Sequence, residues 1–302
     1  MLKLIERYQG CLLGLAVGDA VGTTLEFTAK GSFSPIDDLV GGGPFNLAAG
    51  QWTDDTSMAL CLAESLIYNK GFNPKDQMNR YCNWWQYGYM SSTGECFDIG
   101  GTVSQALNCY LETGNVFAGS IEPESAGNGS LMRLAPIALF FRGDDKALVK
   151  YSGESSRTTH GTAECIDACE YFSCLLDQVF NGITKEKLLS AVSYKPETAN
   201  ISQIATGSFM SKPEEDIHGN GYVVDSLEAA LWSFFSTNTF ESAILSAANL
   251  GEDADTTAAI CGQIAGAYYG ISGIKSSWLD KLHMKIDIEN MATALLSLNP
   301  NK

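Results

Sequence analysis

Residues 50–71, GQWTDDTSMALCLAESLIYNKG, decide the fold class that we predict for this chain. From Met58 onward, apolar side chains recur at the three- and four-residue spacing of a helix, and a Lys-Gly pair supplies a typical C-terminal stop. Four oxygen-bearing residues, 53–56, directly precede this run. One of them would be enough to cap a helix, and adjacent carboxylates repel each other. The stretch therefore raises the question of why Asp54 and Asp55 stand together.

Helical periodicity extends over most of the chain. No run of alternating apolar and polar residues is long enough for a sheet, and no strand–helix–strand rhythm occurs. We therefore predict an all-α protein. Because no Pro/Ser-rich linker separates two halves, we expect one compact domain over residues 1–302. The expected helices span residues 4–21, 58–71, 74–89, 100–113, 130–141, 144–157, 161–181, 184–194, 224–236, 239–249, 256–270 and 287–297.

Composition and charge exclude several functional classes. The 302 residues are 45% hydrophobic and 18% charged, as in soluble globular proteins. Nineteen basic against 35 acidic residues give a net charge of −16, and no Lys/Arg-rich run is present, so we expect no nucleic-acid partner.

Two apolar stretches were candidates for a targeting or membrane segment. Residues 1–22 are interrupted by glycines and by Asp19, and residues 256–274 carry four glycines, so we interpret both as buried helices and expect no membrane association. Nine scattered cysteines without a CxxC pair predict free thiols in a reducing cytoplasm.

A second acidic cluster lies 200 residues beyond the first. In NLGEDADTTAAI, residues 249–260, an Asp-x-Asp-Thr pattern again opens an Ala-rich helix. Helix capping explains either cluster alone. Four carboxylates that converge in one cleft, however, would need compensating charge, which two divalent cations supply. Without Cys or His in either cluster, and without EF-hand spacing, the oxygen ligands favour Mg²⁺ or Mn²⁺.

Seven ordered sequence blocks also carry a family resemblance: GCLLGLAVGDAVGTTLEF, WTDDTSMAL, FDIGGT, GNGSLMRLAPIAL, the Thr-His pair at 159–160, GYVVDSLEAALW and GEDADTTAAI. Together they resemble the ADP-ribosylglycohydrolase family of the dinitrogenase-reductase-activating type. The resemblance implies an all-α fold with a binuclear Mg²⁺ or Mn²⁺ centre. It also implies hydrolysis of the N- or O-glycosidic bond that links ADP-ribose to a protein side chain, with arginine preferred.

The resemblance assigns metal and catalytic positions. Glu26 would lie beside the metals as a ligand or gate, although an ordinary surface glutamate fits the sequence as well. Asp98 would lie near the scissile ribose as a general acid or base, although an Asp-x-Gly turn explains it equally. The residues after Asp98 depart from the family pattern, which leaves the finer substrate contacts open. The metal ligands would be Thr53, Asp54, Asp55, Asp253, Asp255 and Thr256.

The resemblance also assigns substrate-binding positions. Gly129 and Ser130 would contact phosphate from a turn that leads into a helix, where outward-facing N–H groups can bind an anion. His160 would face the ligand, and Tyr222 would stack on adenine or fill the core. For Arg133, one turn further along, a phosphate contact and a structural ion pair both remain open.

Two rival functions remain at this point. The acidic pair could serve a metal-dependent hydrolase of another ADP-ribose conjugate or a nucleotide. Alternatively, the chain could be a catalytically silent module that binds ADP-ribose. The expected partners are an ADP-ribosylated protein and ADP-ribose, and we expect a monomer.

Overall fold

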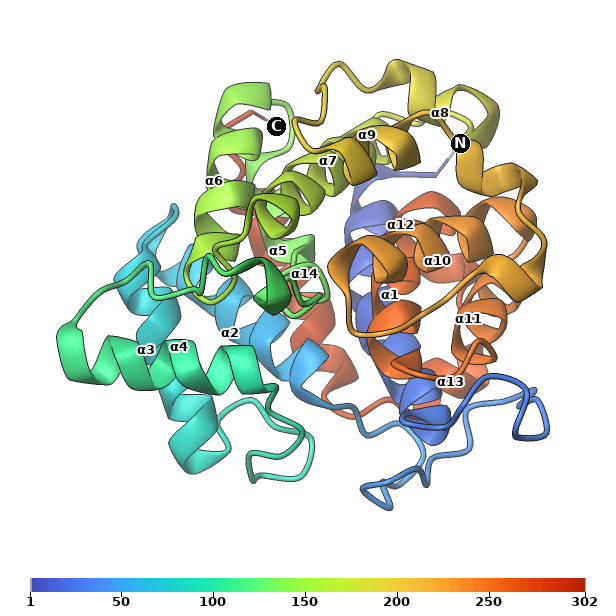
Figure 1. Ribbon diagram of the computed structural model, residues 1–302, viewed down its shortest axis with the longest axis horizontal. Coiled ribbons are helices and arrows are strands. Elements are labelled where there is room, and N and C mark those ends of the chain that lie inside the picture. The colour runs from blue at the N-terminus through green and yellow to red at the C-terminus, as the bar shows by residue number, and fades with distance from the viewer. Residues whose placement is uncertain (1, 302) are drawn as a thin grey trace.

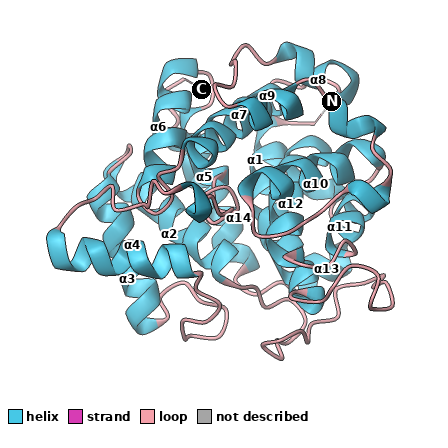
Figure 2. Cartoon of the chain, viewed as in Figure 1, coloured by secondary structure: helices cyan, strands magenta, loops and turns pink. Residues whose placement is uncertain are grey.

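The computed structural model describes residues 2–301, and this part of the chain forms fourteen α-helices and no β-sheet (Figure 2). The all-α prediction is confirmed. None of these helices has the length and hydrophobicity needed to cross a membrane. The helices are α1 (Leu4–Gly22), α2 (Asp54–Asn69), α3 (Pro74–Tyr87), α4 (Gly101–Thr113), α5 (Ala135–Phe141), α6 (Asp145–Arg157), α7 (Ala163–Phe180), α8 (Lys185–Ala191), α9 (Ala199–Ala205), α10 (Val223–Ser236), α11 (Phe240–Ala248), α12 (Ala254–Tyr269), α13 (Ser276–Lys281) and α14 (Lys285–Leu298).

The antiparallel pair α1 and α12 forms the centre of the molecule (Figure 1). Helices α10 and α11 pack on one side of this pair, while α2, α5 and α14 lie on the other (Figure 1). One hydrophobic cluster draws residues from both ends of the chain, from Tyr8 in α1 to Leu295 in α14. The two acidic clusters lie at the starts of α2 and α12, and these two helix ends are neighbours.

A ridge of small residues lets α1 and α12 approach until their backbones touch. Glycine recurs at every fourth position of α1, from Gly10 to Gly22. A Cβ atom added to any of these four glycines would lie 2.3 Å or less from a carbonyl oxygen of α12. Gly262 and Gly266 of α12 are equally close to α1. Side chains are thus excluded from this interface, and the polar ends of the two helices are brought together.

The helix predicted at 130–141 begins at Ala135 instead. Pro136 has no N–H to bond to the carbonyl of Met132, so the preceding residues form turns. The side-chain amide of Gln263 donates to the carbonyls of Leu131 and Met132 at 3.1 and 2.7 Å. A distant glutamine thus satisfies backbone groups that a longer helix would have paired, and sequence periodicity could not reveal this.

Other helix boundaries also differ from the prediction. Helix α2 begins at Asp54 and α12 at Ala254, so each acidic cluster lies in or beside a first helical turn. The short helices α9 and α13 were not predicted. Ile201 and Trp278 are fully buried in them, which indicates that tertiary packing rather than local periodicity stabilises these segments.

Adding a methyl group at Gly18, where α1 and α12 touch, should destabilise the protein. We expect Gly18→Ala to cost roughly 1–3 kcal/mol in the free energy of unfolding, because its methyl group would overlap the carbonyl oxygen of Ala258. Gly71→Ala is the matched control, since nothing lies within 4 Å of a Cβ at that position. Urea denaturation followed by circular dichroism measures both variants. Equal stability of the two would refute the close-packing argument.

Candidate metal centre and active site

The N-terminus of α2 is capped by Asp19 of α1. The backbone N–H groups of Thr53 and Thr56 donate to the two Asp19 carboxylate oxygens at 2.9 and 3.0 Å, and both threonine hydroxyls donate to the same oxygens. Thr53, the N-cap residue, makes no side-chain cap of its own. Capping therefore does not account for Asp54 and Asp55, because another helix supplies the cap.

Asp19 was not among the predicted site residues. The signal in the sequence was a lone acidic residue inside an otherwise apolar, glycine-rich helix. Such a residue is costly to bury unless it is well hydrogen-bonded, and Asp19 is fully buried with four donors around it. Its partners lie 34 and 37 positions away, so local sequence could not reveal them.

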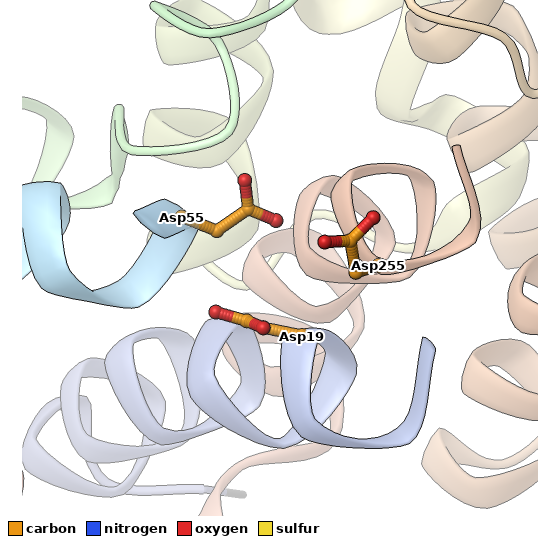
Figure 3. Close-up of side chains that lie close together, drawn as sticks. All are labelled: Asp19, Asp55 and Asp255. Atoms are coloured by element: carbon orange, nitrogen blue, oxygen red, sulfur yellow. The ribbon is translucent and has the colours of Figure 1, made fainter. Parts of the chain in front are cut away.

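The structure brings the two acidic clusters together. Asp19, Asp55 and Asp255 each direct a carboxylate oxygen from a different helix into one group, in which these oxygens lie within 4.8 Å of one another (Figure 3). Asp255 also belongs to a second such group, with Glu26 and Asp98. The shared Asp255 joins two neighbouring groups of carboxylate oxygens.

A cavity of about 320 Å³ lies over these carboxylates. No Lys or Arg of residues 2–301 is among its lining residues. Its polar lining comprises Glu26, Asp54, Asp98, Thr102, Asn128, His160, Asp253, Asp255 and Thr256. Thr53 and Asp55 lie directly beneath, where both are fully buried.

The chemistry of these groups fits divalent cations. Asp55 Oδ2 and Asp255 Oδ1 are buried and have no hydrogen-bond partner among the described residues. Burial and the negative charges of neighbouring carboxylates raise the pKa of Asp54, Asp55 and Asp255 well above the usual range. An oxygen-only set of ligands with this excess of negative charge suits Mg²⁺ or Mn²⁺.

The hydroxyl protons of Thr53 and Thr256 are directed to carboxylates. The Thr53 hydroxyl donates to Asp19 at 3.0 Å, and the Thr256 hydroxyl donates to Asp55 Oδ1 at 3.1 Å. Because each hydroxyl proton is directed to a carboxylate, the oxygen lone pairs stay available to a cation. Asn128 also contributes by donating to Asp253 Oδ2 at 2.8 Å, a contact that sequence reasoning missed.

Glu26 and Asp98 form a hydrogen-bonded carboxyl pair. Burial and the charge of Asp98 raise the pKa of Glu26 to about 9. Burial also raises the pKa of Asp98 to about 7, while hydrogen bonds from Glu26 and Asp54 work in the opposite direction. Without bound cations, the pair therefore holds a proton near neutral pH. Asp98 also has a left-handed backbone with φ of 60°, a strained conformation of the kind found at functional sites.

His160 lies under the turn at residues 127–129 and reaches the cavity. Burial and the nearby charge of Arg133 lower its pKa to about 3, so the ring is neutral. Arg133 Nη2 donates to the Thr159 hydroxyl at 2.7 Å, and this hydroxyl lies 2.8 Å from His160 Nδ1. Within residues 2–301 the Thr159 proton has no other acceptor, so it is donated to Nδ1. The remaining ring proton is then on Nε2, where it can be donated into the cavity.

Arg133 itself is completely buried and does not line the cavity. Its guanidinium donates to the Gly129 carbonyl and lies 4.7 Å from the centre of the Tyr81 ring. No carboxylate of the described residues pairs with it, so neither interpretation offered for Arg133 describes its contacts. It holds the 127–130 turn in place and orients Thr159.

The predicted phosphate cradle needs correction. Gly129 lines the cavity, and a Cβ there would lie 2.8 Å from His160 Cε1, so glycine is required. The Ser130 hydroxyl instead accepts a hydrogen bond from Ser156 in the core, so its side chain turns away from the cavity. Because the following helix begins only at Ala135, the 127–130 turn does not lead directly into a helix N-terminus, and the helix starts that line the cavity are those of α2, α4 and α12.

Tyr222 is half-buried beside a second hollow of about 400 Å³. This hollow shares Thr102, Gly127 and Gly221 with the main cavity and continues it. The Tyr222 hydroxyl donates to Glu164 at 2.6 Å, which fixes the direction of the ring. An extended ligand could therefore occupy both hollows.

Comparison with known proteins identifies the family. The model of the ADP-ribosylglycohydrolase family matches residues 1–302, and the chain belongs to this family. It is 43% identical over 298 residues to the ADP-ribosylarginine hydrolase Tri1 of Serratia proteamaculans (strain 568), covering 99% of this chain and 81% of the relative. It is 33% identical over 299 residues to the ADP-ribosyl-[dinitrogen reductase] glycohydrolase of Rhodospirillum rubrum, covering 97% and 96%.

A solved structure agrees with this assignment. The chain superimposes with a TM-score of 0.88 on a structure described as an ADP-ribosylglycohydrolase-related protein complex. The sequences are 41% identical, and the match covers 98% of this chain and 99% of the other. The family resemblance drawn from the seven sequence blocks is confirmed, together with its all-α fold.

The stability of the metal-stripped protein should fall as pH rises from about 5 to about 9. Asp19, Asp98 and Glu26 have raised pKa values of about 6, 7 and 9, so the folded state binds more protons than the unfolded state in this range. The stabilisation that these groups provide is complete at pH values below their pKa values in the unfolded chain. It is lost as the pH rises through their pKa values in the folded protein. Thermal unfolding in EDTA at several pH values measures the slope.

Mg²⁺ or Mn²⁺ should reverse this loss, because cations replace protons as counter-charge. At 100 times the dissociation constant they would add about 2.7 kcal/mol to the free energy of unfolding. Asp255→Asn should flatten the pH slope, whereas Asp280→Asn, at an exposed position, should leave it unchanged. A melting temperature indifferent to divalent cations at pH 8 would contradict the metal-centre interpretation.

Proposed function

We propose that this protein hydrolyses the glycosidic bond between ADP-ribose and an arginine side chain of a protein, releasing ADP-ribose. The observation that carries the proposal is the convergence of two distant acidic clusters on one cavity, with buried carboxylate oxygens that lack partners. The arginine preference is supported by the similarity to ADP-ribosylarginine hydrolases.

The proposal includes two divalent cations, Mg²⁺ or Mn²⁺. When bound, they would supply Lewis acidity and orient ribose hydroxyl groups. The four carboxylates at the starts of α2 and α12 support the number, because two divalent cations balance four negative charges. Asp19 would position the ligands rather than bind a cation, because its carboxylate accepts four hydrogen bonds from the backbone and hydroxyl groups of Thr53 and Thr56. The residues that would hold the cations are Thr53, Asp54, Asp55, Asp253, Asp255 and Thr256.

The Glu26–Asp98 pair would accept and donate the protons that are transferred during the reaction. Hydrolysis breaks the bond from the anomeric carbon to the arginine nitrogen and forms a bond from that carbon to a water oxygen. The water loses a proton, and the leaving nitrogen gains one. Glu26 and Asp98 each place a carboxyl oxygen within 4.8 Å of an Asp255 oxygen, so one could accept the proton of the water while the other donates a proton to the leaving nitrogen. Asp98 would take the general acid or base role, with Glu26 beside it.

The remainder of ADP-ribose would extend from the main cavity into the hollow beside Tyr222. The Nε2–H group of His160 would donate to a ribose or phosphate oxygen, and the absence of a side chain at Gly129 leaves room for close backbone contact. The ring of Tyr222, held by Glu164, would stack on adenine. Ser130 would contribute only through its backbone.

The rival functions differ in what they require of these residues. A silent ADP-ribose-binding module would not need buried carboxylates whose oxygens lack partners. A nucleotide phosphohydrolase could use the same acidic groups, but the relatives at 43% identity are named ADP-ribosylarginine hydrolases. Glycosidic hydrolysis is therefore the proposal that we prefer.

We also propose that the protein is a monomer in a reducing cytoplasm. The nine free cysteines support the compartment, because seven of them are buried and none forms a disulfide in residues 2–301.

Incubation with an arginine-ADP-ribosylated protein should release intact ADP-ribose in the presence of Mg²⁺ or Mn²⁺. Asp255→Asn should lower the rate by at least about 100-fold, because it removes a carboxylate common to both groups. Chromatography of the products measures the rate of ADP-ribose release. A helical circular dichroism spectrum of the variant that matches the wild type excludes unfolding. Release of AMP instead would support phosphoryl hydrolysis. Tight binding of ADP-ribose without turnover would support the silent module.

A further inference from the structure

Three phenylalanines form an aromatic wall, of which Phe27 lines the main cavity. We use this term for Phe27 and Phe45, which lie in the long connection before α2, and for Phe97, which lies in the connection between α3 and α4. The centre of the Phe45 ring lies 6.4 Å from that of Phe27, edge to face, and 5.1 Å from that of Phe97. Phe27 itself lines the cavity with its neighbour Glu26, and Phe97 directly precedes Asp98. Two residues of the wall are therefore direct sequence neighbours of Glu26 and Asp98, the proposed proton-transfer pair.

The exposed position of Phe27 is imposed by the backbone. Its side chain is 69% exposed, although burying an aromatic ring is strongly favourable. Its φ of 60° is left-handed, which is rare for a bulky residue and costly to maintain. The Phe27 N–H donates to the Glu252 carbonyl and the Glu252 N–H donates to the Thr28 carbonyl, each at 2.7 Å. The chain thus fixes an exposed ring next to the start of α12.

The wall lies at the end of the site where the departing side chain would be. The hollow beside Tyr222 joins the main cavity through Thr102, Gly127 and Gly221, and Phe27 does not border that hollow. If the nucleotide part of the substrate fills the hollow, its anomeric carbon lies over the carboxylates. The modified residue of the target protein then leaves past Glu26 and Phe27.

The chemistry of this end suits a flat cation. The Glu26 and Asp98 carboxyls lie at the foot of the wall, and no Lys or Arg lines the cavity within residues 2–301. A guanidinium group binds well to an aromatic face and to carboxylates at its edge. On the basis of the proposed function, we propose that the aromatic wall, and Phe27 above all, binds the guanidinium of the ADP-ribosylated arginine and selects this substrate over neutral side chains.

The test distinguishes a contribution of the aromatic face at position 27 from a contribution of side-chain size alone. Phe27→Leu keeps an apolar side chain but removes the ring, whereas Phe27→Trp keeps an aromatic face. For an ADP-ribosylated arginine peptide, we expect Phe27→Leu to raise KM about 5- to 30-fold with little change in kcat, because the lost contact is present before and during bond breaking. Phe27→Trp should stay within about threefold of the wild type.

Binding of free ADP-ribose, measured by calorimetry, is the internal control. All three proteins should bind it equally, because ADP-ribose carries no guanidinium group. Wild-type KM in Phe27→Leu would overturn the inference, as would a parallel loss of ADP-ribose affinity, which would place the wall against the nucleotide. If the wild-type protein itself releases no ADP-ribose from the arginine peptide, the proposed function fails, and that outcome is distinct from a failure confined to Phe27.

Discussion

The backbone-to-backbone contact of α1 and α12 is the constraint on which the site depends. Glycines at every fourth position of α1 remove the side chains that would separate the helices, and this places Asp19 beside Asp255. Asp19 then caps α2 from outside and draws the first acidic cluster towards the second. The same contact that joins the two ends of the chain therefore assembles a concentration of buried negative charge. That charge needs cations or protons, which links the packing of the fold to the chemistry of the cavity.

The sequence was most informative where a pattern is local or repeated. Helical periodicity predicted the all-α class, and the paired Asp-Asp and Asp-x-Asp clusters predicted that 53–56 and 253–256 meet. The prediction failed where distant groups replace local ones. Gln263 satisfies carbonyls ahead of α5, so the 130–141 helix begins late. Asp19 caps a helix 34 residues away, and Ser130 turns into the core because Ser156 bonds to it.

Two strained residues and a buried hydrogen-bond relay border the cavity. Phe27 and Asp98 both have left-handed backbones, and they flank the mouth of the cavity. The hydrogen-bonded series Arg133–Thr159–His160 fixes a donor at His160 Nε2, and the guanidinium of Arg133 itself does not face the cavity. The fold thus offers hydrogen-bond donors and aromatic faces to a substrate while leaving charge compensation to cations. An anionic nucleotide and a cationic side chain can both be accommodated in such a site.

Crystals grown with Mn²⁺ and measured for anomalous scattering test the central claim most directly. The account predicts two Mn²⁺ peaks about 3.5–4 Å apart, with the carboxylate of Asp255 close to both. The oxygens of Asp55 and Asp255 that lack partners should then be ligands. A crystal in which Mn²⁺ is absent from these carboxylates at saturating concentration, with Asp255 protonated and hydrogen-bonded instead, would contradict it.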